Sequence, residues 1–125
     1  MRFVIELNPV PKKNSLEIHV NPRTGKPFVS QGKVYKAYER ACAQYIPHVD
    51  KPVDVRCNVK AVFYRKDRRK VDLANLQEAL LDILVKYGLI EDDNYTIVGG
   101  MDGSRVYVDK EHPRTEVTIT WLKEE

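Results

Sequence analysis

The feature that most constrains the fold is an amphipathic run near the middle of the chain. Over residues 72–87, apolar side chains recur at intervals of three and four positions; they are Leu73, Leu76, Leu80, Ile83 and Tyr87. This spacing places them on one face of an α-helix, and Gly88 is a residue that commonly ends one. The run therefore predicts a helix whose apolar face packs against another element.

Alternating patterns on both sides of this helix predict β-strands. In residues 52–64, apolar positions alternate with polar ones, as expected of a strand with one buried face. Further strands are expected at residues 2–7, 95–99, 106–108 and 115–122. These segments indicate one sheet.

A second helix is expected over residues 30–46, where Val34, Ala37, Tyr38, Ala41 and Tyr45 have helical spacing and Pro47 follows. Before it, the sequence NPRTGKP is typical of a hairpin tip or a loop. The order β-α-β-α-β-β predicts a two-layer α+β fold, with one mixed sheet of about four to five strands and two helices on one face. The length suits a single domain over residues 1–125.

The composition is that of an ordinary folded protein, with 42% hydrophobic and 31% charged residues. It contains no apolar run long enough to cross a membrane and no signal-peptide pattern, so we expect a cytoplasmic protein without a membrane partner. Cys42 and Cys57 lack metal-site spacing and are expected to be reduced and buried. There is no phosphate-binding glycine motif, so a nucleotide cofactor is not expected.

Basic residues gather in three places, although the net charge is only +3. An isolated basic run is as often a solvated loop as a binding site, but three runs in one small chain favour a polyanionic partner. Residues 23–36 form one of these runs. The candidate phosphate-binding residues come from the other two and are Lys12, Lys13, Arg65, Lys66, Arg68, Arg69 and Lys70.

Carboxylates lie at both ends of the predicted central helix. Asp72 directly follows a basic run, and Asp92 and Asp93 lie in the turn beyond the helix. Each has an ordinary structural interpretation, as a helix N-cap or as turn residues. Because the helix is about 22 Å long, Asp72 and Asp93 can meet only if the chain after Gly88 runs back along it, or if two subunits bring them together. The spacing leaves both arrangements open.

These stretches resemble the RusA-type Holliday junction endonucleases, with similarity to a phage or prophage-like subgroup. The most specific part lies within residues 65–94 and comprises RRKVD, NLQE, LLDILVKYG and LIEDDN. Upstream, VPKKNS and FVSQGKVYKAYERA are similar to family segments, and DGSRVYVDKEHPRTEV is similar more loosely. The resemblance covers most of the chain.

The resemblance implies a homodimer that binds four-way DNA junctions and cuts two strands symmetrically with Mg²⁺, for which Mn²⁺ could substitute. It matches Asp72 to the first acid of the family, Asn75 to its asparagine, which we place among the DNA-binding residues, and Asp92 and Asp93 to its acid pair. Carboxylates are the oxygen ligands that Mg²⁺ prefers, and the ion can activate water and stabilise charge on a phosphate.

Two positions depart from the family pattern. Ala74 stands where the family has a second aspartate, and Glu78 stands where it has a lysine. The two positions share a helix face, and helical side chains lean toward the N-terminus. We therefore hypothesise that Glu78 replaces the missing acid. The predicted metal ligands are then Asp72, Glu78, Asp92 and Asp93.

Glu78 and Asp82 are like charges four residues apart, a repulsion that a bound cation would relieve, although Asp82 could also pair with Lys86. Lys70, with Arg69, is the candidate to replace the missing lysine at the scissile phosphate. The main alternative is a catalytically weakened protein that binds junctions without cutting them. A structural dimerisation module is a third interpretation.

Overall fold

The computed structural model describes residues 1–12 and 16–123, and the side chains within them except those of residues 16–17 and 29–31. Its main element is a mixed five-stranded sheet, made of β1 (Arg2–Ile5), β4 (Cys57–Arg65), β5 (Val98–Gly100), β6 (Arg105–Val108) and β7 (Arg114–Trp121). The central strand β4 pairs antiparallel with β7 and parallel with β5 and β6, and β1 pairs antiparallel with β7. The expected mixed sheet is confirmed.

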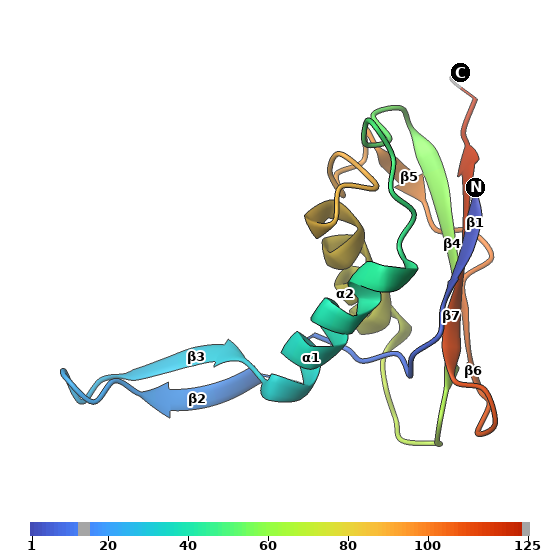
Figure 1. Cartoon of the computed structure of the whole chain (residues 1–125). Helices are drawn as coiled ribbons and strands as arrows, with labels where there is room; N and C mark the ends of the chain where they lie inside the picture. Colours follow the sequence, from blue (N-terminus) through green and yellow to red (C-terminus); the bar gives the residue numbers. More distant parts are fainter. Residues whose placement is uncertain (13–15, 124–125) are drawn as a thin grey trace.

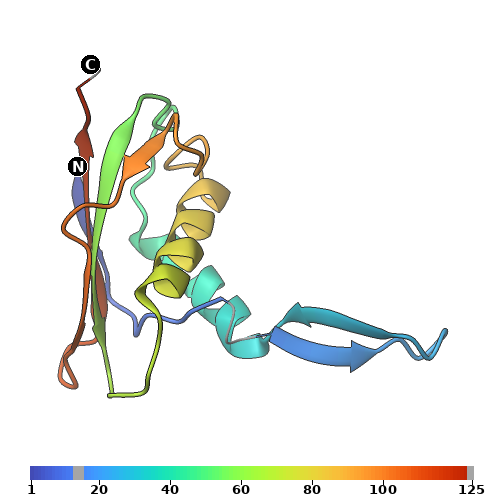
Figure 2. The same ribbon diagram turned by 180° about the vertical axis from the view of Figure 1, so that it is seen from behind.

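Two helices lie on the same side of this sheet, α1 (Lys33–Cys42) and α2 (Leu73–Lys86) (Figure 1, Figure 2). A short 3-10 helix, η2 (Ala43–Tyr45), extends α1. The arrangement confirms the two-layer α+β fold. Neither of the helices in the described ranges is long and apolar enough to cross a membrane.

The central helix agrees closely with its prediction. Its buried side chains are those of Leu76, Ala79, Leu80, Ile83 and Leu84. Tyr87 follows the last helical residue, and Gly88 has a φ of +76°, the left-handed conformation that glycine adopts without a steric penalty at a helix end. The regular spacing of large apolar residues was enough to define this helix, because its period matches the turn of the α-helix.

The buried face of α1 differs from the one predicted. Tyr35, Tyr38 and Cys42 are buried, whereas Val34 is 69% exposed and Ala37 is also exposed. The helix turns its two large aromatic rings inward because they remove more apolar area from water than Val34 and Ala37 would. It also begins at residue 33 rather than 30, since residues 27–31 form a strand.

The prediction of one long strand over residues 52–64 was wrong in its first part. Val53 is paired with the segment after α2, donating to the carbonyl of Leu89 and accepting from the amide of Glu91. Val55 is 55% exposed, and β4 begins only at Cys57. The alternating pattern continued across this boundary because a short pairing with another segment favours the same extended backbone. The three strands expected after α2 are present as β5, β6 and β7.

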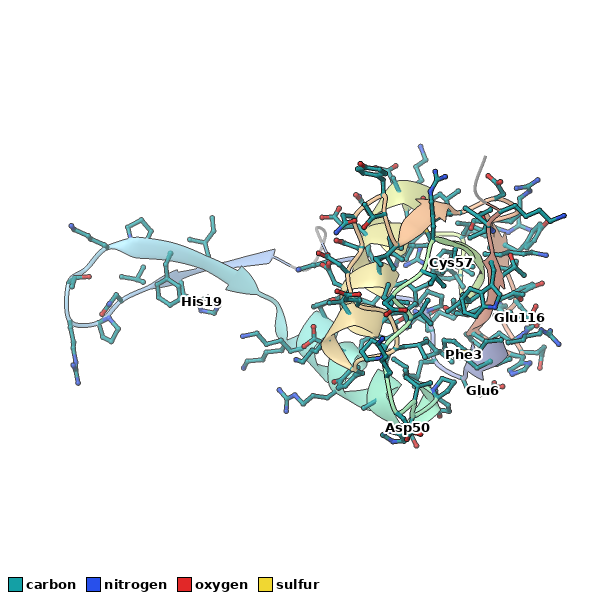
Figure 3. The ribbon with its side chains drawn as sticks, turned by 90° about the horizontal axis from the view of Figure 1, so that it is seen from above. Phe3, Glu6, His19, Asp50, Cys57 and Glu116 are labelled. Atoms are coloured by element: carbon teal, nitrogen blue, oxygen red, sulfur yellow. The ribbon has the colours of Figure 1, made fainter. Side chains whose placement is uncertain are left out.

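A hairpin formed by β2 (Leu16–Val20) and β3 (Pro27–Gln31) projects away from the body (Figure 1, Figure 2). Its tip contains Gly25 in the left-handed region, and the amide of Gly25 donates to the carbonyl of Asn21. This confirms the hairpin interpretation of NPRTGKP. His19 lies out on this hairpin, whereas Cys57 lies within the body (Figure 3). Cys42 and Cys57 are both buried and unbridged, as expected.

Candidate functional site

The carboxylate of Asp72 lies exposed at the start of α2. Asp72 occupies the N-cap position, and its backbone carbonyl accepts from the amides of Asn75 and Leu76. Its side chain caps none of the described helix amides, and it accepts instead from the side-chain amide of Asn75 at 3.5 Å. The N-cap interpretation is therefore right in position only, since the carboxylate remains directed to solvent beside the positive end of the helix.

The basic loop between β4 and α2 is held in place by other segments. The amide of Lys66 donates to Oδ1 of Asn8 at 2.8 Å, and the guanidinium of Arg65 donates to the carbonyl of Arg69 at 2.9 Å. Oδ1 of Asp67 accepts from the amide of Arg69 at 3.0 Å. Arg65 thus shapes the loop. The predicted DNA-binding side chains that remain exposed in this loop are Lys66, Arg68, Arg69 and Lys70.

The acid pair beyond α2 belongs to a loop with its own internal hydrogen bonds. Asp92 accepts from the amide of Asp93 at 2.7 Å and from the side chain of Asn94 at 3.0 Å, and these contacts lower its pKa. The pKa of Asp93 is raised by partial burial and then by the neighbouring carboxylates of Asp92 and Asp82. Asp93 is therefore crowded by negative charge.

The loop after α2 runs back beside the C-terminal half of the helix. Asp93 interacts electrostatically with Asp82, which lies ten residues after Asp72 and so about 15 Å farther along the helix axis. Within the described parts of the chain, no three His, Cys, Asp or Glu side chains lie close enough together to hold a metal ion. A single chain in this conformation thus does not gather Asp72, Glu78, Asp92 and Asp93 into one centre.

Lys12 lies against the acidic face of α2 rather than in the basic loop. Its Nζ donates to Oδ2 of Asp82 at 2.8 Å, which raises the pKa of Lys12, and the charges of Glu39 and Glu78 act in the same direction. Lys86 pairs with Glu39 instead of with Asp82. The like charges of α2 are therefore compensated from outside the helix, which its sequence could not indicate. Lys13, another predicted DNA-binding residue, lies outside the described residues.

The turn between β6 and β7 contributed no predicted site residue, yet it forms a cleft with the basic loop. The cleft has a volume of about 460 Å³ and is lined by Asp67, Arg68, Val108 and Lys110. The two walls come from segments about 40 residues apart in sequence. The sequence signal that could have indicated this turn is DKEHPR, in which an aspartate at the end of a strand precedes two cations and a proline.

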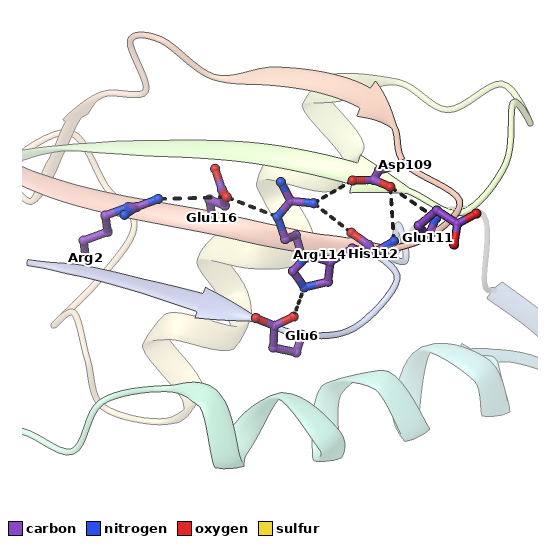
Figure 4. Close-up of polar contacts among 7 residues, drawn as sticks. All are labelled: Arg2, Glu6, Asp109, Glu111, His112, Arg114 and Glu116. Carbon is purple, nitrogen blue, oxygen red and sulfur yellow. Dashed lines mark hydrogen bonds and ion pairs between the residues drawn. The ribbon is translucent and has the colours of Figure 1, made fainter.

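An ion-pair network stabilises this turn (Figure 4). Asp109 accepts from the amides of Glu111 and His112 through Oδ1 and from the guanidinium of Arg114 through Oδ2 at 2.9 Å. Arg114 also donates to Glu116 at 3.1 Å, and its guanidinium lies 3.8 Å from the centre of the Tyr64 ring. Burial of the Asp109–Arg114 pair is partial, and the network fixes the conformation of the turn.

Comparison with known proteins identifies the family of this chain. No curated protein sequence matches it. A family model described as endodeoxyribonuclease RusA matches residues 6–120, which is nearly the whole chain and includes the basic loop, α2 and the acid pair. The chain therefore belongs to the RusA endodeoxyribonuclease family, and this membership implies Holliday junction resolvase activity.

Proposed function

We propose that this protein is a metal-dependent endodeoxyribonuclease, of phage or prophage type, that resolves four-way DNA junctions in recombination and repair. It would act as a homodimer, because two symmetric cuts require two matched sites. The observation that carries the proposal is the position of Asp72. Its exposed carboxylate directly follows the cations of the basic loop at the positive end of α2, and this supports a site where a phosphate and a cation are held together.

The basic loop would bind the phosphodiester backbone without reading sequence. Arg68, Arg69 and Lys70 are exposed, and side chains of this kind bind phosphates largely by releasing counterions. Lys70 is closest in sequence to Asp72 and is the cation we assign to the scissile phosphate. Asn75, which donates to Asp72, would keep that carboxylate oriented.

The acids suit a hard cation, but the fit in one chain is partial. The raised pKa of Asp93 supports a role in metal binding, since a cation near the crowded carboxylates would relieve their repulsion. Mg²⁺, or Mn²⁺ in its place, would activate a water molecule and stabilise charge on the phosphate. Asp72, Glu78, Asp92 and Asp93 are the proposed ligands, and a second subunit or a shift of the acid loop would be needed to gather them.

A junction-binding protein without catalytic activity is the second candidate. It is favoured by the absence of a three-carboxylate group in the described residues of one chain and by Ala74, which offers no carboxylate. Lys12 already compensates the charge of Asp82 and acts on Glu78, so part of the acidic face is balanced without a metal.

The two candidates are separated by a cutting assay on labelled four-way junctions and matched duplexes. Mg²⁺, Mn²⁺ and a chelator would be compared, with light scattering used to measure the oligomeric state. The nuclease proposal expects paired symmetric cuts that require the metal, made by a dimer. Tight junction binding without any cuts under both metals would favour the second candidate, and a monomer at working concentration would count against resolution by symmetric cutting.

The role of Glu78 has its own test. If Glu78 replaces the missing acid, Glu78→Lys alone should abolish cutting, because it puts a cation where a ligand is needed. Adding Ala74→Asp in the same chain restores the family pattern and should restore cutting. Full activity of Glu78→Lys by itself would remove Glu78 from the ligand set.

A further inference from the structure

The cleft between the basic loop and the β6–β7 turn has the composition of an anion site. Arg68 and Lys110 are exposed cations on its two walls, and Val108, which is about half exposed, adds an apolar surface. Asp67 is the acid in the lining, but its carboxylate accepts from the amide of Arg69 and lies 3.9 Å from the guanidinium of that residue. The lining is therefore positive in sum and offers an apolar surface beside its cations.

Both walls of the cleft are fixed relative to each other. The amide of Asp109 donates to the carbonyl of Arg65 at 2.8 Å, which joins the end of β6 to the end of β4. Asp109 and Arg114 hold the turn beyond β6, since Arg114 donates both to Asp109 and to the carbonyl of His112 at 2.9 Å (Figure 4). A preformed site loses less conformational entropy when it binds a ligand than a mobile loop does.

The cleft lies near the proposed cutting site. Arg68 precedes Asp72 by four residues, which span at most about 14 Å of extended chain. A strand of B-DNA advances about 3.4 Å per nucleotide along its axis. A phosphate held in the cleft and one beside Asp72 would then belong to the same short stretch of about four nucleotides.

We infer that this cleft binds a backbone phosphate of the DNA strand, with Arg68 and Lys110 contacting it from opposite walls and Val108 contacting the adjoining sugar. The inference rests on the proposed function, which makes DNA the partner. It adds the β6–β7 turn to the DNA interface, and it gives the turn the task of setting the position of the strand relative to Asp72.

The test measures DNA binding by fluorescence anisotropy in chelator, so that cutting plays no part. Lys110→Ala and Lys110→Glu are compared with Lys123→Ala, which removes the same charge from an exposed lysine near the C-terminus. Junction and duplex DNA are titrated between 50 and 200 mM salt, and thermal melts check that each variant is folded.

We expect Lys110→Ala to weaken binding by about 3- to 10-fold at 100 mM salt and to reduce the salt slope by about 0.9, the value for one phosphate contact. Lys110→Glu should lose more DNA affinity than Lys110→Ala, and Lys123→Ala should bind DNA as the unmodified protein does. Arg68→Ala combined with Lys110→Ala should cost less than the sum of the two single losses, because the shared phosphate is already released in either one.

The inference would be refuted if folded Lys110→Ala had an unchanged salt slope of DNA binding. It would also be refuted if the losses of binding free energy in the two single variants simply added in the double variant. The result is distinct from the fate of the proposed function. If the unmodified protein cuts junctions and Lys110→Ala binds DNA with unchanged affinity, the proposed function stands and the phosphate site in the cleft is refuted. If the unmodified protein never cuts junctions but Lys110→Ala shows the expected loss of DNA affinity, the phosphate site in the cleft stands and the proposed function is refuted.

Discussion

The loops that flank α2 carry opposite charges, and each lies beyond the helix end that favours the other sign, whereas Asp72 and Lys86 at the helix ends have the favoured signs. The cations of residues 68–70 precede the N-terminus, and the acids Asp92 and Asp93 follow the C-terminus. A helix is stabilised by the reverse arrangement, with anions at its start and cations at its end. Departures from a local rule of this kind are expected at functional sites, so the difference supports roles for both ends beyond stabilising the fold.

The two flanking loops are held by different sets of hydrogen bonds. The basic loop depends on Asn8 and Asp109, which belong to distant segments. In the acid loop, Asp92 accepts from the next two residues and Asn94 accepts from the amide of Thr96. Val53 and Arg56 bind the chain on either side of this pair, at Leu89, Glu91 and Tyr95. Distant segments thus anchor both ends, and the conformation of the acid pair itself is set by hydrogen bonds within its own loop.

The largest effect should come from Asp72→Asn, which keeps the shape of the side chain and removes its charge. We expect junction cutting to fall by more than about 100-fold, since even residues that only support metal ligands typically contribute about 10- to 100-fold. Junction binding in chelator should be retained, or should tighten as negative charge near the phosphates is lost. Single-turnover cutting and anisotropy measure the two quantities. Asp50→Asn, at an exposed position in the segment between η2 and β4, is the control and should cut normally.

Mixing two inactive variants would show whether the two ends of α2 act together across a dimer. Asp72→Asn and Asp93→Asn subunits would be mixed and allowed to exchange. If each site takes Asp72 from one subunit and Asp93 from its partner, every mixed dimer has one intact site, so about a quarter of the original sites return. Recovery of nicking on one strand is expected, because Asp93 interacts with Asp82, which lies about 15 Å along the helix from Asp72. Complete inactivity of proven mixed dimers would place each site within a single subunit.

A smaller effect should follow from removing the cations of the basic loop that precede Asp72 in the sequence. Replacing Arg68, Arg69 and Lys70 by alanine should lower the salt slope of DNA binding by up to about 2.7, at about 0.9 for each phosphate contact. The ratio of the DNA affinity of the unmodified protein to that of this variant would then fall by about 40-fold between 50 and 200 mM salt. Anisotropy titrations at several salt concentrations measure it. A slope that stays constant would show that the loop is only solvated.

The smallest effect should be a gain in stability at the acidic end. The raised pKa of Asp93 means that the folded protein holds its proton more tightly than the unfolded chain does. Ionised Asp93 therefore costs stability above that pKa, and Asp93→Asn should raise the Tm at pH 7 by about 1–2 °C, a small amount because the site is largely exposed to solvent. The gain in Tm should vanish at pH values below the pKa that Asp93 has in the unfolded chain. Thermal melts at pH 7 and pH 3 measure it, and an equal gain at both would assign it to another cause.

Local patterns alone predicted the central helix and the turn at the tip of the hairpin, but not the two hairpin strands. In α2 the stripe from Leu76 to Ile83 has the period of the helix itself, and Gly88 supplies the conformation that ends it. The pattern of alternating residues likewise gave the last strand, β7, within one residue at each end. These features were readable because the side-chain spacing that defines each of them lies within the element.

The tertiary structure decided which segments meet. Tyr35 rather than Val34 is buried in α1, and Val53 pairs with the segment after α2 instead of extending β4. At the candidate site, it brought Lys12 to Asp82 and Lys110 to the basic loop, and it set Asp93 near Asp82 in the C-terminal half of α2. The types of residue needed for a DNA-cutting site were evident in sequence, but their partners lie 40 to 70 positions away, and only packing of the whole chain determines contacts at that separation.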